Sequence, residues 1–203
     1  MASDATRQHH NAGMAIEREI KLPLPLAGVS SLPDKLIWLG FSLRAPRVHE
    51  TNTIFDTAGR DLRERGQLIR LRRVGERAIL TYKGPGQSVR HKSREEIELD
   101  ISDAGPMREI LDRLGYRPVF FYEKFRTEYS RDQGILTIDE TPIGNFLELE
   151  GVEEWIDLTA AELGYVESDY ILLSYASLYL DYRQQHPEAS SDMIFASGKR
   201  PLQ

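Results

Sequence analysis

The chain has 203 residues, 40% of them hydrophobic, a formal net charge of −6 and no cysteine. This length supports one domain with a substantial core, and the lack of cysteine excludes disulfides, a thiolate nucleophile and thiolate metal ligands, which favours a reducing, cytoplasmic location. The acidic balance argues against a protein that coats nucleic acid, and the sequence contains neither a signal-peptide pattern nor an apolar run of about 18 residues that could span a membrane.

Alternating apolar and polar residues, separated by turn residues, predict eight strands. They fall at about 15–22, 48–56, 67–74, 77–83, 94–101, 119–130, 134–139 and 145–151. Helices are expected at 32–39, capped by the Ser30 and Ser31 region, at 104–114 after the N-cap Asp103, and from about 170 to 183. Many consecutive antiparallel strands with few helices are typical of an α+β protein built on one sheet or barrel.

The two ends of the chain show no such periodicity. Residues 1–14 and 186–203 are polar or rich in Pro, Ser and Gly, so we expect a flexible N-terminal tail, one folded domain at 15–185 and a flexible C-terminal tail. The first tail contains His9 and His10, which we interpret as solvated chain rather than as a metal site.

Charged side chains share one face of seven of the predicted strands, because every second residue of a strand points the same way. In the first strand, Glu17, Glu19 and Lys21 alternate with apolar Ile16, Ile20 and Leu22, apart from Arg18 on the apolar face. The other ionisable positions of this kind are Arg70, Arg72, Lys83, Glu96, Glu98, Asp100, Lys124, Arg126, Glu128, Asp139, Glu148 and Glu150. A solvated outer face of an ordinary half-buried sheet is the simpler interpretation of any single strand, but such a face mixes neutral polar residues with charges and does not segregate the signs by strand.

Closure of the sheet with the charged face inward accounts for this pattern. An eight-stranded antiparallel closed β-barrel with flanking helices has no exposed edges and leaves room inside for side chains or one small ligand. Buried charges cost several kcal/mol each unless they are paired or coordinated. Converging Lys and Arg side chains suit a polyphosphate, and carboxylate pairs such as Glu148 and Glu150 suit Mg²⁺ or Mn²⁺. The pattern therefore predicts a triphosphate and a divalent metal in the barrel.

The ordered motifs resemble those of the CYTH, or triphosphate tunnel, metalloenzymes, from about residue 15 to 182. The E-x-E-x-K of the first strand, the R-x-R of the third and the T-Y-K-G-P around Lys83 carry the resemblance, together with two later E-x-E pairs, E-K-F-R and T-I-D. The segment 114–124 and the late 163–165, followed by Ser174 and Tyr175, look most like the branch that contains class IV adenylate cyclases. Other members are thiamine triphosphatases and inorganic or RNA triphosphatases, and relatives suggest a homodimer.

The resemblance implies a role for each matching residue. It implies Mg²⁺ or Mn²⁺ at Glu17, Glu19, Asp139, Glu148 and Glu150. It implies a triphosphate at Lys21, Arg70, Arg72, Lys83, Glu96, Glu98, Lys124 and Arg126, where the two acids either face the substrate or orient the bases. Lys83, Asp139 and Glu148 are the expected catalytic residues. Attack of water on the terminal phosphorus of ATP, thiamine triphosphate or tripolyphosphate makes a triphosphatase, whereas attack of a ribose 3′-hydroxyl on the α-phosphorus makes a cyclase.

Two other classes of protein remain open at this point. A non-catalytic polyphosphate or nucleotide binder needs the bases but not the clustered acids, and a structural β-sandwich needs neither. Phe41, Phe55 and Tyr122 could stack a base or thiazole, but we interpret them as packing residues, and His49 and His91 as ordinary surface or strand residues.

Overall fold

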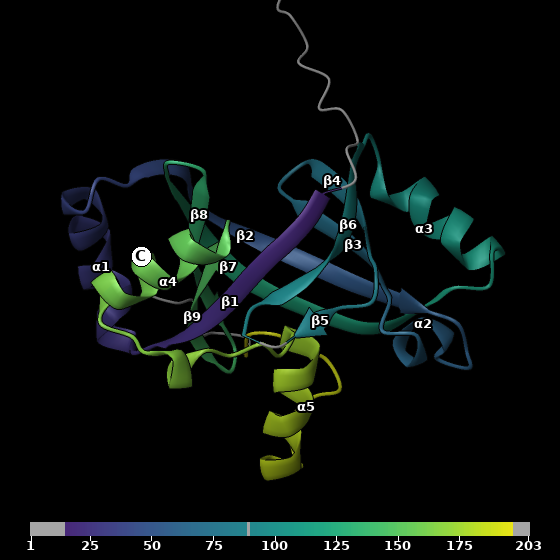
Figure 1. Ribbon diagram of the computed structural model, residues 1–203. Coiled ribbons are helices and arrows are strands. Elements are labelled where there is room, and N and C mark those ends of the chain that lie inside the picture. Colours follow the sequence, from purple (N-terminus) through teal and green to yellow (C-terminus); the bar gives the residue numbers. More distant parts are fainter. Residues whose placement is uncertain (1–14, 89, 197–203) are drawn as a thin grey trace, which may run out of the picture.

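The computed structural model describes residues 15–88 and 90–196, which form a β-barrel with helices around it (Figure 1). The strands are β1 (Ala15–Leu24), β2 (Ser42–Asp56), β3 (Leu68–Val74), β4 (Arg77–Lys83), β5 (Gln87–Ser88), β6 (Lys92–Ile101), β7 (Arg117–Arg131), β8 (Gly134–Thr141) and β9 (Gly144–Glu150). The helices are α1 (Leu26–Trp38), α2 (Asp61–Glu64), α3 (Ala104–Arg113), α4 (Glu153–Leu163) and α5 (Tyr175–Gln185), with a 3-10 turn at Glu167–Asp169.

The predicted eight-stranded closed barrel is confirmed. The strands follow the order β1-β9-β8-β7-β2-β3-β4-β6, and β6 pairs back with β1, so the sheet closes with antiparallel neighbours throughout. The short β5 pairs only with β6 and stands outside the ring. The closing ladder runs from Ala15 opposite Glu96 to Glu19 opposite Lys92. Beyond it, the Lys21 backbone exchanges two hydrogen bonds with Ile171, of 3.0 and 2.8 Å, so a later segment continues the seam.

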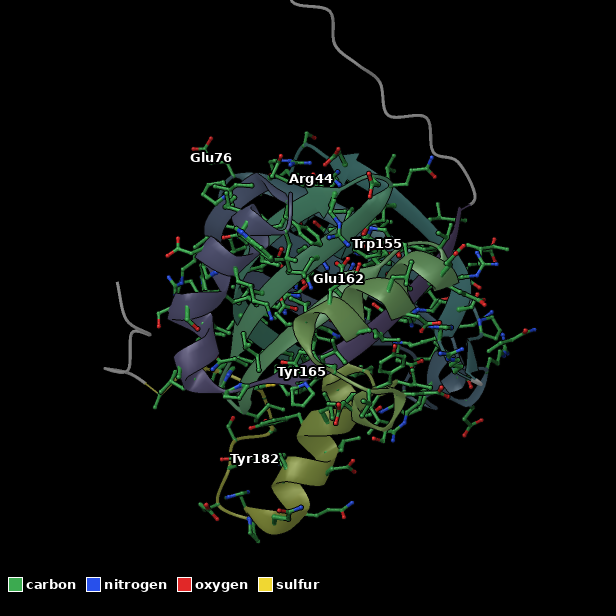
Figure 2. The ribbon with its side chains drawn as sticks, turned by 60° about the vertical axis from the view of Figure 1, so that its left-hand side comes forward. Arg44, Glu76, Trp155, Glu162, Tyr165 and Tyr182 are labelled. Carbon is green, nitrogen blue, oxygen red and sulfur yellow. The ribbon has the colours of Figure 1, made fainter. Side chains whose placement is uncertain are left out.

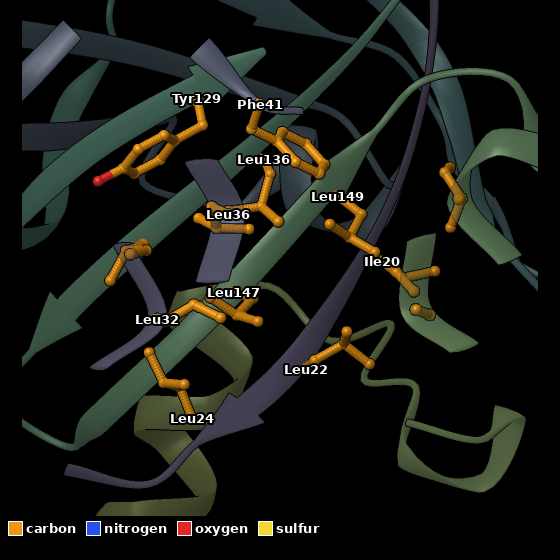
Figure 3. Close-up of a cluster of buried hydrophobic side chains, with 13 residues drawn as sticks. Ile20, Leu22, Leu24, Leu32, Leu36, Phe41, Tyr129, Leu136, Leu147 and Leu149 are labelled. Carbon is orange, nitrogen blue, oxygen red and sulfur yellow. The ribbon is translucent and has the colours of Figure 1, made fainter. Parts of the chain in front are cut away.

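The apolar parity of the strands faces outward, and helices cover most of it, although Ile97 and Leu99 of β6 stay exposed. The largest core cluster joins Ile20, Leu147 and Leu149 of the barrel to Leu36 of α1 and Ile156 of α4 (Figure 3). On another part of the barrel, Phe55 and Leu71 pack against Leu111 of α3. Because period-2 alternation then leaves the opposite parity pointing inward, the charged face lines the barrel interior as predicted.

The helices depart from the prediction in four places. The first begins at Leu26, so Ser30 and Ser31 lie inside it and donate to the Ala27 carbonyl instead of capping it, and the predicted cap is wrong. The last helix begins at Tyr175, not at about 170, because the Ser174 side chain caps it by accepting from the Ser177 N–H at 3.1 Å. The sequence prediction missed α2 and also α4, which lies across the barrel strands and carries Trp155 (Figure 2).

Part of the predicted C-terminal tail is packed against the barrel. Strand β7 extends beyond its pairing with β8, which begins at Phe125, and Met193 fills the free edge with two 3.0 Å backbone hydrogen bonds, to Phe121 and from Glu123. Met193 is fully buried, so this residue of the predicted tail packs against the barrel. Residues 1–14, with His9 and His10, and 197–203 lie outside the described residues. Within the described part of the chain, no helix is long and apolar enough to cross a membrane.

Candidate active site

The barrel encloses a cavity of about 330 Å³ whose lining is dominated by charge. Nine basic and seven acidic side chains line it: Lys21, Arg44, Arg70, Arg72, Lys83, Lys92, Arg94, Lys124, Arg126, Glu17, Glu19, Glu96, Glu98, Glu128, Glu148 and Glu150. These include every residue that the sequence predicted to bind substrate or metal, with the exception of Asp139. A β-sandwich with solvated charged faces is therefore excluded, because the charges meet in one enclosed space.

Lys83 lies between two acids from different strands. Its ammonium is 2.7 Å from both carboxylate oxygens of Glu17 on β1 and 3.0 Å from Glu96 Oε2 on β6. Burial, with Glu17 close by, raises the pKa of Glu96 to about 8, although Lys83 opposes this shift. This corner of the cavity therefore holds a negative Glu17, a positive Lys83 and a Glu96 that is mostly protonated at neutral pH.

The neighbouring Glu19 is held by two lysines. Burial disfavours its charged form, but Lys21 and Lys92 outweigh burial and keep the pKa of Glu19 well below its usual value. Its Oε1 is 2.7 Å from Lys92 Nζ and 3.7 Å from Lys21 Nζ. Burial, which Glu19 opposes, lowers the pKa of Lys92 to about 8, so this base is charged at neutral pH and loses its charge as the pH rises through about 8.

Glu150 differs from the other acids because no ion pair reaches it from any basic side chain that the structure describes. It lies directly opposite Glu19 in the β1–β9 ladder. Burial, together with Glu17 and Glu19, raises the pKa of Glu150 to about 7. A carboxylate in such an environment gains from a nearby cation.

The carboxylates of β1 and β9 offer the donor set that a hard divalent cation prefers. Among residues 15–88 and 90–196, no three acids are close enough to hold an ion as they stand. The reason is visible in the ion pairs: Lys83 and Arg94 occupy Glu17, Lys92 occupies Glu19, and Lys21 lies 3.2 Å from Glu148. The donors therefore fit Mg²⁺ or Mn²⁺ in kind, provided that some of these lysine and arginine pairs exchange for the ion.

Asp139 lies behind the lining instead of in it. It is completely buried, and its Oδ2 accepts from Lys124 Nζ at 2.8 Å, from the Arg126 guanidinium at 2.6 Å and from the Tyr175 hydroxyl at 2.7 Å, while Oδ1 accepts from Arg126 Nε at 2.7 Å. Arg126 also donates to Glu148. Because every contact of Asp139 is with a donor of the protein, this residue orients two cavity bases.

The arginine pair of β3 is held by polar residues of its neighbouring strands. Arg70 donates to Thr81 Oγ1 at 3.2 Å and to Glu98 Oε1 at 3.1 Å, while its buried Nε has no protein partner among the described residues. Arg72 donates through Nε to Asn52 Oδ1 at 3.1 Å. An unpartnered buried donor costs about 1–3 kcal/mol, so Arg70 Nε favours a bound acceptor such as a phosphate oxygen.

Several site residues escaped the sequence prediction for identifiable reasons. Lys92 and Arg94 share the inward parity of Glu96. Arg94 lies within the predicted strand 94–101 but was passed over, and Lys92 requires a strand start two residues earlier. Glu50 and Asn52 share the inward parity of Ile54 on β2. Because this face combines one acid, one amide and one apolar residue, it shows no charge pattern in the sequence. Burial opposes the charged form of Glu50, but nearby cations, Lys124 first among them, outweigh burial and lower the pKa of Glu50 to about 2.

Of the remaining aromatic and histidine candidates, one lines the cavity and the others do not. Phe41 and Phe55 belong to the outer cores, whereas Tyr122 lines the cavity and is not a pure packing residue. His49 is partly exposed and pairs with Glu123 at 2.9 Å, and His91 is buried against Asp157, also at 2.9 Å. Neither histidine lines the cavity.

Comparison with known proteins identifies the same architecture elsewhere. The CYTH domain model matches residues 15–161, well over half of the chain. A protein of Methanocaldococcus jannaschii that carries the name "Putative adenylate cyclase" is 32% identical over 133 residues, which span 65% of this chain and 75% of that protein.

Two solved structures share the fold. A "putative adenylate cyclase" of Vibrio parahaemolyticus superposes with a TM-score of 0.71 at 18% identity, covering 83% of this chain and 99% of that one. A "putative adenylyl cyclase" of Hippeastrum, described as having a dominant triphosphatase activity, gives a TM-score of 0.58 at 20% identity, covering 85% and 96%.

Proposed function

The chain belongs to the CYTH family, and from that premise we propose that it is a divalent-metal-dependent triphosphatase that hydrolyses a linear triphosphate inside the barrel. The observation that carries the proposal is the enclosed cavity lined by nine bases and seven acids. Such an interior is costly to keep empty and is stabilised by a ligand that brings both negative oxygens and divalent cations.

The charged lining supports hydrolysis of a linear triphosphate as the first candidate. Its charged side chains outnumber the apolar ones, Ile54, Leu68, Ile135 and Ala176, and the two aromatic rings, Tyr122 and Tyr175. Adenylate cyclase activity is the second candidate, supported by the name of the Methanocaldococcus jannaschii relative. The Hippeastrum protein has a cyclase name but a dominant triphosphatase activity, which supports hydrolysis as the first candidate.

Hydrolysis of a triphosphate demands mainly positioning and charge neutralisation from the protein. Arg70, Arg72, Lys124 and Arg126 would bind the phosphate oxygens, and Lys83 would neutralise charge on the phosphoryl group that is transferred. Water attacks the terminal phosphorus, the bond to the bridging oxygen breaks, and orthophosphate and diphosphate leave. This step needs no side-chain nucleophile.

Glu17, Glu19, Glu148 and Glu150 would hold Mg²⁺ or Mn²⁺, which when bound supplies Lewis acidity at the phosphate oxygens. We assign Asp139, with its four protein donors, to the orientation of Lys124 and Arg126 rather than to the metal. Glu98 orients Arg70 in the same manner, at 3.1 Å.

Metal dependence and product identity test the proposal together. The purified protein is incubated with Mn²⁺ or Mg²⁺ and, in separate reactions, with tripolyphosphate, thiamine triphosphate and ATP, and products are followed by phosphorus NMR. We expect orthophosphate and diphosphate from tripolyphosphate, with turnover lost in EDTA and restored by excess Mn²⁺.

Each other outcome points to one alternative. Cyclic AMP and diphosphate from ATP, without hydrolysis of tripolyphosphate, would establish the cyclase. Binding of tripolyphosphate that is unaffected by EDTA, with no turnover of any substrate, would identify a non-catalytic binder.

A further inference from the structure

The segment that follows the CYTH match contributes a side chain to the cavity. After the two backbone hydrogen bonds between Ile171 and Lys21, the chain enters α5 at Tyr175, behind the Ser174 cap. Figure 1 shows α5 projecting from the barrel as a separate element. Its first residue nevertheless lines the cavity, and only 6% of Tyr175 is exposed. This side chain lies outside the matched residues 15–161.

Tyr175 contacts charged side chains from three different strands of the barrel. Its hydroxyl donates to Asp139 Oδ2 on β8 at 2.7 Å. Its ring centre is 5.2 Å from Lys21 Nζ on β1 and 5.1 Å from Lys124 Nζ on β7, which is within the range of cation–π attraction. Phe146 and Tyr122 hold the ring from its other sides, with centroids 5.7 and 6.1 Å away.

These contacts affect how Lys21 and Lys124 are positioned to bind a phosphate. Asp139 Oδ2 accepts from three donors at once, and one of them is Lys124. The Tyr175 hydroxyl competes with Lys124 for the lone pairs of this oxygen, which weakens the hydrogen bond from Lys124. The same hydroxyl also fixes the plane of the Asp139 carboxylate. The ring holds both ammonium groups without accepting their hydrogen bonds, so their N–H donors remain available to a ligand.

We propose that Tyr175 is a positioning residue for triphosphate binding, which sets the geometry of Lys21 and Lys124 through its ring and through Asp139. This inference rests on the proposed function of the cavity. It makes the C-terminal segment part of the site instead of a peripheral helix.

Tyr175→Phe removes one oxygen atom and keeps the ring. Asp139 retains its three hydrogen bonds from Lys124 and Arg126, so the variant leaves no buried carboxylate unpaired and is expected to fold. Tyr179→Phe is the matched control. Tyr179 lies one turn after Tyr175 in the same helix and does not line the cavity. Its hydroxyl donates to the backbone carbonyls of Ser190 and Asp192 at 2.8 and 2.9 Å.

The first measurement is calorimetric titration of tripolyphosphate in EDTA, which needs neither metal nor turnover. Without the phenol, Asp139 holds Lys124 more tightly and loses its fixed plane, so Tyr175→Phe is expected to raise the dissociation constant about 10-fold or more, the worth of one hydrogen bond to a charged group, whereas Tyr179→Phe leaves it at the wild-type value. With Mn²⁺ present, Tyr175→Phe should raise KM more than it lowers kcat. Equal dissociation constants for wild type and both variants would overturn the inference.

The two proposals fail in different ways. A wild-type protein that binds tripolyphosphate without hydrolysing it contradicts the triphosphatase assignment, while the binding comparison still decides the role of Tyr175. A wild-type protein that binds tripolyphosphate neither in EDTA nor with Mn²⁺ overturns both.

Discussion

Lys83→Met is expected to lower kcat/KM for tripolyphosphate by about 10²–10³-fold, the loss typical when one preorganised donor to developing charge is removed. Lys83 is almost fully buried and donates to both oxygens of Glu17, so its ammonium has a fixed position in the cavity. Methionine keeps the length and apolar stem of the side chain without its charge. Glu17 keeps Arg94 at 3.3 Å, and Glu96, whose pKa is already about 8, stays protonated more readily.

Steady-state kinetics with matched melting curves measure this effect. Arg77→Met is the control, because Arg77 lies on the same strand β4 but does not line the cavity, and its pair with Asp100 is exposed to solvent. Lys83→Met with activity equal to that of Arg77→Met would contradict the place of Lys83 in the site. A shared loss of melting temperature would instead show that the two changes act on stability.

Glu148→Gln is expected to reduce turnover by about 1000-fold, corresponding to several kcal/mol of charge stabilisation at the phosphate oxygens. Lys21, Arg126 and Lys124 outweigh the cost of burial and keep the pKa of Glu148 well below its usual value, so the wild-type residue is an anion at any working pH. The amide retains the shape and one acceptor but loses the charge that a divalent cation requires.

The metal dependence separates this effect from loss of phosphate binding. Glu148→Gln should raise the Mn²⁺ concentration needed for half-maximal rate, whereas Lys83→Met, which frees Glu17 from a competing ammonium, should not raise it. The control is Glu153→Gln, at the start of α4, whose carboxylate pairs with Arg18 at the surface. An unchanged Mn²⁺ requirement in Glu148→Gln would remove this residue from the metal site.

The alternation of side chains along the strands was sufficient to predict most of the fold and most of the site residues. In β1, β3, β4, β6, β7 and β9, the charged parity identified the inward residues, because a pleated strand sends alternate side chains to opposite faces and helices cover most of the apolar parity. The same rule favoured closure, while a β-sandwich with solvated charged faces stayed an alternative until the coordinates brought the charges into one cavity.

Residues that depend on long-range contacts could not be predicted in this way. Glu50 and Asn52 alternate with Ile54 in β2, and such a mixture resembles any solvated edge until the pairing with Arg72 is known. Tyr175 is separated from Asp139 by the whole of α4, and only the backbone bridge between Ile171 and Lys21 brings it to the cavity. The placement of Asp139 behind the lining also required coordinates, because parity gives the direction of a side chain but not its depth.

The most direct test of the account is a crystal of the protein grown with Mn²⁺ and a non-hydrolysable triphosphate, with the metal located by anomalous scattering. The account predicts a manganese peak inside the barrel with ligands from Glu17, Glu19, Glu148 and Glu150, and phosphate density along Arg70, Arg72 and Lys83. Manganese and phosphate bound only on the outer surface, with the lysine and arginine pairs of the cavity unchanged, would contradict it.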